Sequence, residues 1–529
     1  MALESVASSP LQSLVTKCGL LSGGLLGLVG LVVTARCIYL ALFHPLARYP
    51  GPLLAKFTDL YSAYHAWQGD IHLDIYRCHQ KYGDHVRYAP NRLVINTAQA
   101  LQDIYGHHGK VTKCSTYRFL AQQAPNTLTL TDKAQHGSRR RVLSQAFSES
   151  SLRLFEPKVR AKLDKFVSII KSQQYEAAWS VPVDMAAAFN HLAFDMMTDI
   201  IFNLDFNTMG DEQYRYAMKA VEESNIRLGV LLQSENLSTA NIDRKLFPRS
   251  VAAGRQFVKF LRILLKQRLQ ATKSTSSPSS PDIFSFLERC RDPNTGKSLS
   301  VAEVSTETAT FVVAGSDTTS TTLAAVSHYL TGSSEWYRKV THEIRSTFSS
   351  LDDIKLGPQL NSCTALRACM DESLRLSPPG GSALWREVES GGALIDGHYI
   401  AQGCDVGVGI YSIHHDPRYW TSPLTFDPAR WTHGDGDRRA KEARQPYMPF
   451  SIGPRSCVGK PLAMAQVMLT FARILWEFDI RRAGSAPSWP GADGEAETVP
   501  VEYPLKDHVS ARKEGPLLCF RPRRVNSNA

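Results

Sequence analysis

One cysteine near the end of the chain stands in a setting suited to metal chemistry. Cys457 lies in the run FSIGPRSCVG, residues 450–459, where glycines flank it and an arginine and a phenylalanine stand close by. Glycines let the backbone turn tightly, so that its N–H groups can approach the sulfur and stabilise negative charge on it. A cysteine thiolate is an axial ligand of haem iron, where it supplies electron density that favours O–O bond cleavage. The run therefore predicts a haem site with Cys457 as the iron ligand; the alternative is a buried structural cysteine.

Three neighbours of Cys457 have roles in such a site. The guanidinium of Arg455 can meet a haem propionate with a fork of N–H groups. Phe450 can lie against the loop and keep water from the sulfur, and Gly459 lets the chain turn beside it. We therefore expect these three residues to belong to the cofactor-binding site.

A long helix with small polar residues at its middle is expected earlier in the chain. Ser300 and Glu303 fit a capping box, which starts a helix, and Gly332 stands just past the expected end at Leu330. The stretch 314–319 (AGSDTT) falls mid-helix. A helical glycine costs about 1 kcal/mol relative to alanine, and threonine can bend a helix by bonding its own backbone. Such local conflicts tend to mark functional sites.

Oxygen activation would explain these residue types. Gly315 would leave space for O2 over the haem, and the Thr318 hydroxyl would hydrogen-bond the oxygen and hold a water. Asp317 would relay protons from solvent, which the breaking of the O–O bond to water requires. The alternative is a small-residue helix contact with a solvated aspartate.

Together these motifs resemble those of the cytochrome P-450 family, and of its fungal microsomal members in particular. The run around Cys457 is the family's haem signature, and the segments 372–375 (ESLR) and 426–431 (FDPARW) resemble two further landmarks in the expected order. The stretch 85–96 predicts two strands and a turn like the family's first sheet, followed by a helix to Tyr105. The resemblance implies a mainly α fold with small β-sheets (α+β), the cytochrome P-450 fold, over nearly the whole chain after residue 45.

The resemblance also assigns roles that the patterns alone do not. Glu372, Arg375 and Arg430 would form a buried ion triad that locks the core behind the haem loop. Losing one member would strand a buried charge, at about 3–5 kcal/mol. Asp317 and Thr318 occupy the family's acid–alcohol positions, which implies a catalytic role for both.

Haem propionates need cations, and the resemblance points to several. His136 and Arg140 stand four residues apart on one helix face and match family positions that hold propionates. Arg386 is a further predicted clamp. Arg139 and Arg141 are instead expected on a basic surface, where they could face an acidic electron donor.

The first part of the chain predicts a membrane anchor. Residues 18–35 carry no charge and are rich in Leu, Val and Gly, which suits a single-pass transmembrane helix. More cations follow the run than precede it, which favours a body in the cytoplasm; a cleaved signal peptide is the competing interpretation. We expect an anchor over residues 1–43, a proline-rich hinge over 44–56 and a haem catalytic domain over 57–529, in the endoplasmic reticulum membrane.

Composition excludes several other classes of protein. The chain has 529 residues, of which 43% are hydrophobic and 21% charged, as in an ordinary globular protein. Its 10 cysteines include no CxxC pair, so neither a zinc site nor a disulfide framework is indicated. The net charge is +10, but no nucleic-acid motif accompanies it, so a lipid membrane is the expected partner and nucleic acid is not.

Electrons must come from a partner, because no flavin or dinucleotide fingerprint occurs in the chain. The resemblance implies a separate NADPH–cytochrome P-450 reductase, with cytochrome b5 as an additional donor. Basic clusters near Arg140 and over residues 438–444 are the predicted docking surface. The expected cofactors are thus haem b in this chain and NADPH through the reductase.

The predicted pocket walls are the loop 114–131, the helix segment 311–314 and the segment 379–384, all rich in apolar residues. Such walls favour an apolar organic substrate. The fungal resemblance suggests hydroxylation, epoxidation or multi-step oxidation in secondary metabolite biosynthesis. Two other functions stay open: a haem–thiolate isomerase, dehydratase or peroxide-using enzyme, and a non-catalytic haem protein. The Asp317–Thr318 pair favours the monooxygenase, because the others need no protons for O2.

Overall fold

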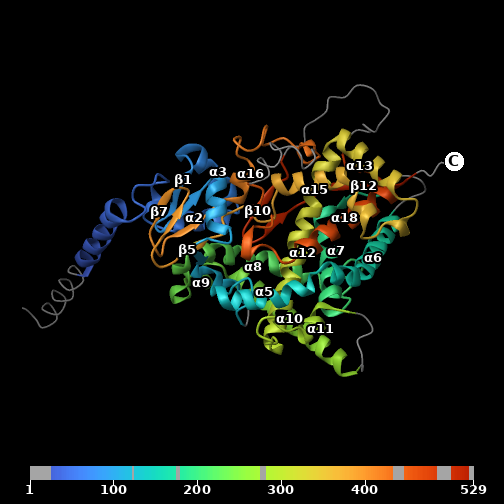
Figure 1. The fold of residues 1–529 in the computed structure, drawn as a ribbon, viewed down its shortest axis with the longest axis horizontal. Helices are drawn as coiled ribbons and strands as arrows, with labels where there is room; N and C mark the ends of the chain where they lie inside the picture. The colour runs from blue at the N-terminus through green and yellow to red at the C-terminus, as the bar shows by residue number, and fades with distance from the viewer. Residues whose placement is uncertain are drawn as a thin grey trace, which may run out of the picture.

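Helices dominate the fold, and four small sheets accompany them among the described residues (Figure 1). The computed structural model describes residues 25–121, 124–173, 179–274, 281–432, 446–484 and 502–523. The α-helices are α2 Leu60–Gln68, α3 Ile71–Tyr82, α4 Ala98–Tyr105, α5 Lys133–Ala146, α6 Glu149–Ser172, α7 Met185–Phe202, α8 Tyr216–Gln233, α9 Ile242–Leu246, α10 Pro248–Ser274, α11 Ile283–Arg289, α12 Val301–Gly332, α13 Ser334–Thr347, α14 Pro358–Asn361, α15 Thr364–Leu376, α16 Ile410–His414 and α18 Lys460–Glu477. The strands are β1 His85–Ala89, β2 Arg92–Ile95, β3 Val111–Lys113, β4 Val183–Asp184, β5 Arg386–Val388, β6 Ala393–Ile395, β7 His398–Ile400, β8 Asp405–Gly407, β9 Phe478–Arg482, β10 Leu505–Asp507, β11 Ala511–Lys513 and β12 Leu517–Pro522. The predicted fold class, mainly α with small β-sheets, is confirmed.

The largest sheet has five strands in the order β1-β2-β8-β5-β3 and lies at the end of the molecule that carries the N-terminal helix (Figure 1). Strands β1 and β2 form the predicted hairpin, with His85 opposite Ile95, and α4 follows it as expected. Strands β3 and β5 pair antiparallel, which places Lys113 directly opposite Arg386. This sheet thereby brings together two cations that are far apart in the sequence.

Helix α12 runs through the middle of the helical part and packs along α7 (Figure 1). Its predicted capping box is confirmed: the Ser300 side chain accepts from the backbone N–H of Glu303, and the Glu303 side chain accepts from that of Ser300. A Cβ at Gly315 would collide with the Met197 side chain of α7. The missing side chain of Gly315 thus gives room to Met197 of α7, and the expectation that Gly315 also leaves space for O2 stays a prediction.

An apolar helix, Leu25–Phe43, projects from the sheet-rich end of the molecule (Figure 1). With 19 residues, this helix is long and apolar enough to cross a membrane, and most of its residues are exposed. Buried Arg87 of β1 fastens its end, since its guanidinium donates to the Leu40 carbonyl at 2.7 Å and its backbone N–H to Pro50 at 2.8 Å. The part of the predicted span before Leu25 lies outside the described residues.

Helix α8 packs closely against the C-terminal segment at Gly229. A Cβ at Gly229 would lie 2.6 Å from the carbonyl oxygen of His508, which the backbone cannot avoid without a shift. We expect Gly229→Ala to lower the midpoint of thermal unfolding. The matched change Gly254→Ala in α10, where a Cβ meets only Ser224 at 3.8 Å, should stabilise the protein by up to about 1 kcal/mol. Equal midpoints for the two variants would contradict this packing.

Candidate active site

Cys457 lies in a tight loop between a 3-10 turn, η7 Gly453–Arg455, and the start of α18. Its backbone N–H donates to the Phe450 carbonyl at 2.8 Å, which closes the loop. Gly453 has φ +65°, and a Cβ there would collide with the Tyr105 carbonyl, so the turn requires glycine. The Cys457 side chain remains accessible from one side of the loop. The sequence thus folds to present one thiol at the edge of a closed turn.

The surroundings of the sulfur favour a thiolate bound to a metal. Although the side chain is accessible, the protein atoms around it displace water and raise the pKa of the Cys457 thiol, whereas the backbone N–H of Gly459 and the guanidinium of Arg140 act in the opposite direction. The loop also stands at the N-terminus of α18, where the helix dipole favours negative charge. A metal cation bound to the sulfur would lower the thiol pKa further than these donors do, because metal binding deprotonates a thiol.

One face of α12 turns toward this loop. The Phe147 ring lies 4.0 Å from the place of a Cβ at Gly459, and its centroid is 5.3 Å from that of Phe311. Ala314 and Thr318 share the helical face of Phe311, at spacings of three and seven residues. Ala314 is exposed and Thr318 half-buried, although both lie mid-helix. The Thr318 hydroxyl donates to the Ala314 carbonyl at 2.6 Å, so it lies on the same helical face as Ala314.

The Asp317 side chain points toward the C-terminal hairpin. Its carboxylate accepts from the ammonium of Lys513 at 3.2 Å and from the hydroxyl of Ser510. The Lys513 side chain is fully buried, and both partners belong to the β10–β11 hairpin region. The two residues of the predicted acid–alcohol pair are therefore adjacent in sequence but occupy different surroundings.

Basic side chains gather beside the Cys457 loop, and each makes the charged form of its neighbours less favourable. Burial, with Arg455 and Lys113 close by, lowers the pKa of His136 to about 3. Burial, Arg386 and Arg455 hold the pKa of Lys113 well below its ordinary value. Burial and Arg386 also lower the pKa of Arg455 to about 10. Like charges held this close need an anion among them.

The residues present fit a haem, whose two propionates would supply that anion. Arg140 donates to the Ser456 carbonyl at 2.5 Å and Arg455 to that of Leu130 at 2.7 Å, so both arginines also brace the loop. Lys113 is a site residue that the sequence did not predict. Its place depends on the pairing of β3 with β5, and its only local signal is a lysine at the end of a short strand.

The prediction that Arg139 and Arg141 face an electron donor is wrong. Arg139 donates to Glu307 of α12 at 3.2 Å and also pairs with Glu303. Arg141 pairs with Asp292 at 2.8 Å. Both arginines therefore form ion pairs with carboxylates inside the protein. These pairs hold α5 against α12 and against the turn after α11.

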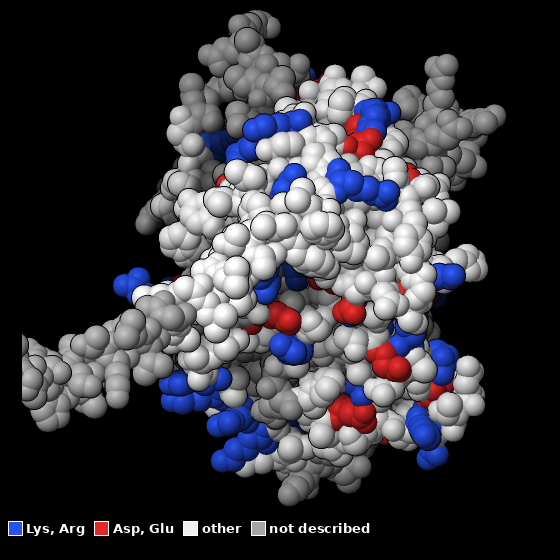
Figure 2. Space-filling model, turned by 90° about the vertical axis from the view of Figure 1, so that its left-hand side faces the viewer, with Lys and Arg blue, Asp and Glu red and all other residues white. Residues whose placement is uncertain are grey.

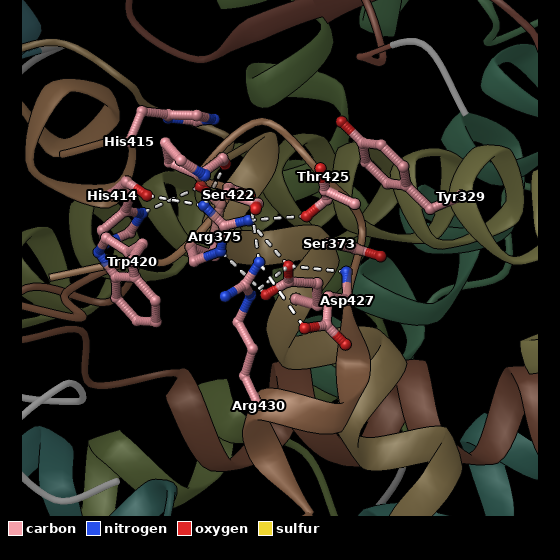
Figure 3. A network of polar contacts seen from close by, with 12 residues as sticks. Tyr329, Ser373, Arg375, His414, His415, Trp420, Ser422, Thr425, Asp427 and Arg430 are labelled. Carbon is pink, nitrogen blue, oxygen red and sulfur yellow. Dashed lines mark hydrogen bonds and ion pairs between the residues drawn. The ribbon is translucent and has the colours of Figure 1, made fainter. Parts of the chain in front are cut away.

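Glu372 and Arg375 of α15 meet Arg430, from the 3-10 turn η6 Pro428–Trp431, in a buried ion triad. Figure 3 shows Arg375 and Arg430 side by side. The Glu372–Arg375 contact is 2.8 Å with both side chains 0% exposed, and the Glu372–Arg430 contact is 3.2 Å. The Trp431 indole N–H donates to the same carboxylate at 2.9 Å. Two guanidinium groups and an indole thus compensate one buried negative charge.

The triad is linked to the Cys457 loop through His414. Arg375 donates to the His414 carbonyl at 2.8 Å, and Figure 3 shows His414 and Trp420 beside it. The His414 Nε2 accepts from the backbone N–H of Met448 at 3.0 Å, just before the loop begins. A displacement of Arg375 would therefore reach the segment that carries the thiol.

We expect Glu372→Gln to lower the free energy of unfolding by about 3–5 kcal/mol, because it leaves two guanidinium groups without their anion. Urea denaturation of the purified chain measures the change. Glu288→Gln is the matched control: Glu288 stands in a motif of the same spacing but is exposed on α11, and should change stability by less than about 0.5 kcal/mol. Similar losses in the two variants would argue against a buried triad.

His414 makes stability depend on pH. Burial and Arg375 lower the pKa of His414 to about 3, so it stays neutral in the folded chain. Below about pH 6.5 the unfolded chain binds a proton that the folded chain does not, and stability falls by about 1.4 kcal/mol per pH unit for this group. We expect His414→Gln to lose about 2 kcal/mol less than the unmodified chain between pH 7 and pH 5. Exposed His342→Gln should leave the pH dependence of the urea midpoint unchanged, and an unchanged dependence in His414→Gln would refute the assignment.

Comparison with known proteins agrees with this geometry. The cytochrome P-450 family matches residues 49–489. The chain is 45% identical over 514 residues to the cytochrome P-450 monooxygenase poxM of Penicillium oxalicum, which covers 96% of this chain and 97% of that protein. It is 60% identical over 341 residues to lcsN of Purpureocillium lilacinum, covering 64% and 99%, and 40% identical over 524 residues to AKT7 of Alternaria alternata, covering 97% and 98%; both are named cytochrome P-450 monooxygenases. The chain therefore belongs to the cytochrome P-450 family.

Proposed function

We propose that this chain is a membrane-anchored haem–thiolate monooxygenase that inserts one oxygen atom from O2 into an apolar organic substrate. Two features carry the proposal: the thiol of Cys457 in its closed turn, and the α12 face with Ala314 and Thr318, whose Phe311 contacts Phe147 beside that turn. A thiolate without a hydroxyl opposite it would suit an isomerase or a peroxide-using enzyme, which needs no proton delivery. The family relation and this pairing favour the monooxygenase.

Each residue of the site has a part in this chemistry. A haem supplies the iron that binds and reduces O2. Cys457 would bind the iron through its thiolate, and the Gly459 N–H would stabilise the negative sulfur. The cationic cluster would hold the propionates; its members are Lys113, His136, Arg140, Arg386 and Arg455. Phe450 packs at the edge of the core beside the loop and would keep water from the sulfur.

Proton delivery would fall to Thr318 and Asp317. The Thr318 hydroxyl holds its proton on the α12 face toward Cys457, bonded for now to the Ala314 carbonyl. Rotation about its side-chain bond would offer that proton to the oxygen side and accept another from water. Asp317, held by Lys513 and Ser510, would supply protons to this helical segment from the other side.

Electrons would reach the site from an NADPH–cytochrome P-450 reductase, with cytochrome b5 as an additional donor. A depression of about 420 Å³ lies beside the Cys457 loop, and its lining includes Arg367, Lys460 and Phe450. The lining also includes Asp371, which pairs with Arg367 at 2.8 Å, so Lys460 is the cation of this depression that suits an acidic protein surface. The predicted basic cluster over residues 438–444 lies outside the described residues.

The membrane contact would include more than the N-terminal helix. Leu53, Leu54, Leu60, Tyr64 and Trp67, in and before α2, are all exposed large hydrophobic residues. Figure 2 shows the side of the molecule from which the N-terminal helix projects: a broad uncharged area adjoins the helix, and a hollow bordered by charges of both signs opens near the centre. We propose an anchor over residues 1–43, a hinge over 44–56 and a catalytic domain over 57–529 that faces the cytoplasm from the endoplasmic reticulum.

The substrate would be an apolar compound, and the fungal relatives support a place in secondary metabolite biosynthesis. Arg87 ties both the end of the anchor, at Leu40, and the hinge, at Pro50, to the body, which would hold the hollowed side close to the bilayer where apolar compounds dissolve.

Reduced carbon monoxide difference spectra of the full chain in microsomes test the proposal. We expect a thiolate-type band that Cys457→Ser abolishes, and NADPH consumption that requires the reductase. Thr318→Ala should keep the band but divert reducing equivalents into hydrogen peroxide several-fold more than the unmodified chain. A thiolate band without reductase-dependent oxygen uptake, over a panel of apolar compounds, would favour the isomerase or carrier alternatives instead.

A further inference from the structure

A small cavity lies behind α12, on the side away from Cys457. Helices α7, α8, α10 and α12 line it, and its polar members are Asn190, Glu222, Ser316 and Asp317. Its volume of about 20 Å³ has room for one or two water molecules, and the polar groups offer the partners that buried water requires. Two carboxylates therefore border one space that can hold water.

Hydrogen bonds connect α8 to the Asp317 segment by two routes. In the first, Asn190 of α7 donates to the Glu222 carboxylate at 3.0 Å and accepts from the Ser320 hydroxyl at 2.6 Å. In the second, Asn225, three residues after Glu222, donates at 3.0 Å to Ser510, whose hydroxyl donates to Asp317. Both routes end at the middle of α12, within one helical turn of Thr318.

The surroundings of Glu222 favour its protonated form. The buried ammonium of Lys513 lies 3.2 Å from Asp317 and also attracts Glu222, so the nearest cation serves two carboxylates. Burial raises the pKa of Glu222, with Asp317 acting in the same direction and Lys513, Asn190 and Arg512 opposing it. Glu222 is half-buried and keeps access to solvent.

We propose that Glu222 is the solvent-side station of the proton path that supplies Asp317 and Thr318. The inference rests on the proposed monooxygenase function and makes Glu222 a positioning residue, since it acts through Asp317. Glu222 takes a proton from solvent water and passes it to water in the cavity, which passes a proton to the Asp317 carboxylate. Each proton that leaves toward Thr318 is replaced by one taken up at Glu222. O–H bonds alone break and form, and no electrons move.

Glu222→Gln tests this role in the full-length, haem-loaded chain with reductase and NADPH and without added substrate. The amide keeps the bond to Asn190 but cannot carry the proton. We expect several-fold more hydrogen peroxide per NADPH than in the unmodified chain, a larger solvent isotope effect on O2 uptake, and partial recovery in Glu222→Asp. Glu223→Gln is the matched control, because Glu223 is the next residue of α8 but bonds to Ser250 and does not line the cavity.

Infrared titration of the resting protein gives a readout that is independent of turnover. We expect a protonated carboxyl band that persists above the titration range of ordinary glutamates, is lost in Glu222→Gln and is retained in Glu223→Gln. Unchanged peroxide yield and an unchanged band in Glu222→Gln, beside a normal unmodified chain, would overturn the assignment to Glu222 alone. An unmodified chain that lacks the thiolate band or reductase-dependent oxygen uptake would overturn the proposed function and this inference with it.

Discussion

The buried charge of Glu372 is the constraint on which the active-site loop depends. A carboxylate with no exposed surface must be compensated on every side, and here Arg375, Arg430 and the Trp431 indole do so from two elements distant in sequence. Arg375 then extends the order to His414, which holds Met448 at the entrance of the loop. The position of the thiol thus depends on a series of polar contacts that begins at the Glu372 carboxylate.

Helix α12 divides the chemistry between its faces. Adjacent residues of an α-helix point about 100° apart, so Thr318 can face the thiol while Asp317 faces the charges of the C-terminal hairpin. The small residue Gly315 serves the close approach of α7, which brings Asn190 within reach of Ser320. The close packing of α7 on α12 and the proposed proton supply therefore involve the same helix–helix contact.

Local signals in the sequence were sufficient for the parts of this structure that depend on neighbours in the chain. The capping box of α12, the β1–β2 hairpin and the turn around Cys457 each rest on residues a few positions apart. Contacts across the fold were not readable in the same way. The place of Lys113 depends on strand pairing, and the side of Gly315 depends on which helix lies next to it. The sequence shows that Arg139 is charged, but it does not show which carboxylates pair with it.

The close approach of Lys113, His136, Arg386 and Arg455, which makes their charged forms less favourable, has a consequence for the amount of the protein in the cell. A chain that gathers buried cations before their anion arrives is less stable than one that has received it, so the prosthetic group stabilises the native state by mass action. Small differences in stability change steady-state abundance several-fold, because chaperones and proteases act on the unfolded fraction. The supply of haem would then regulate how much of this enzyme persists, as well as how much of it is active.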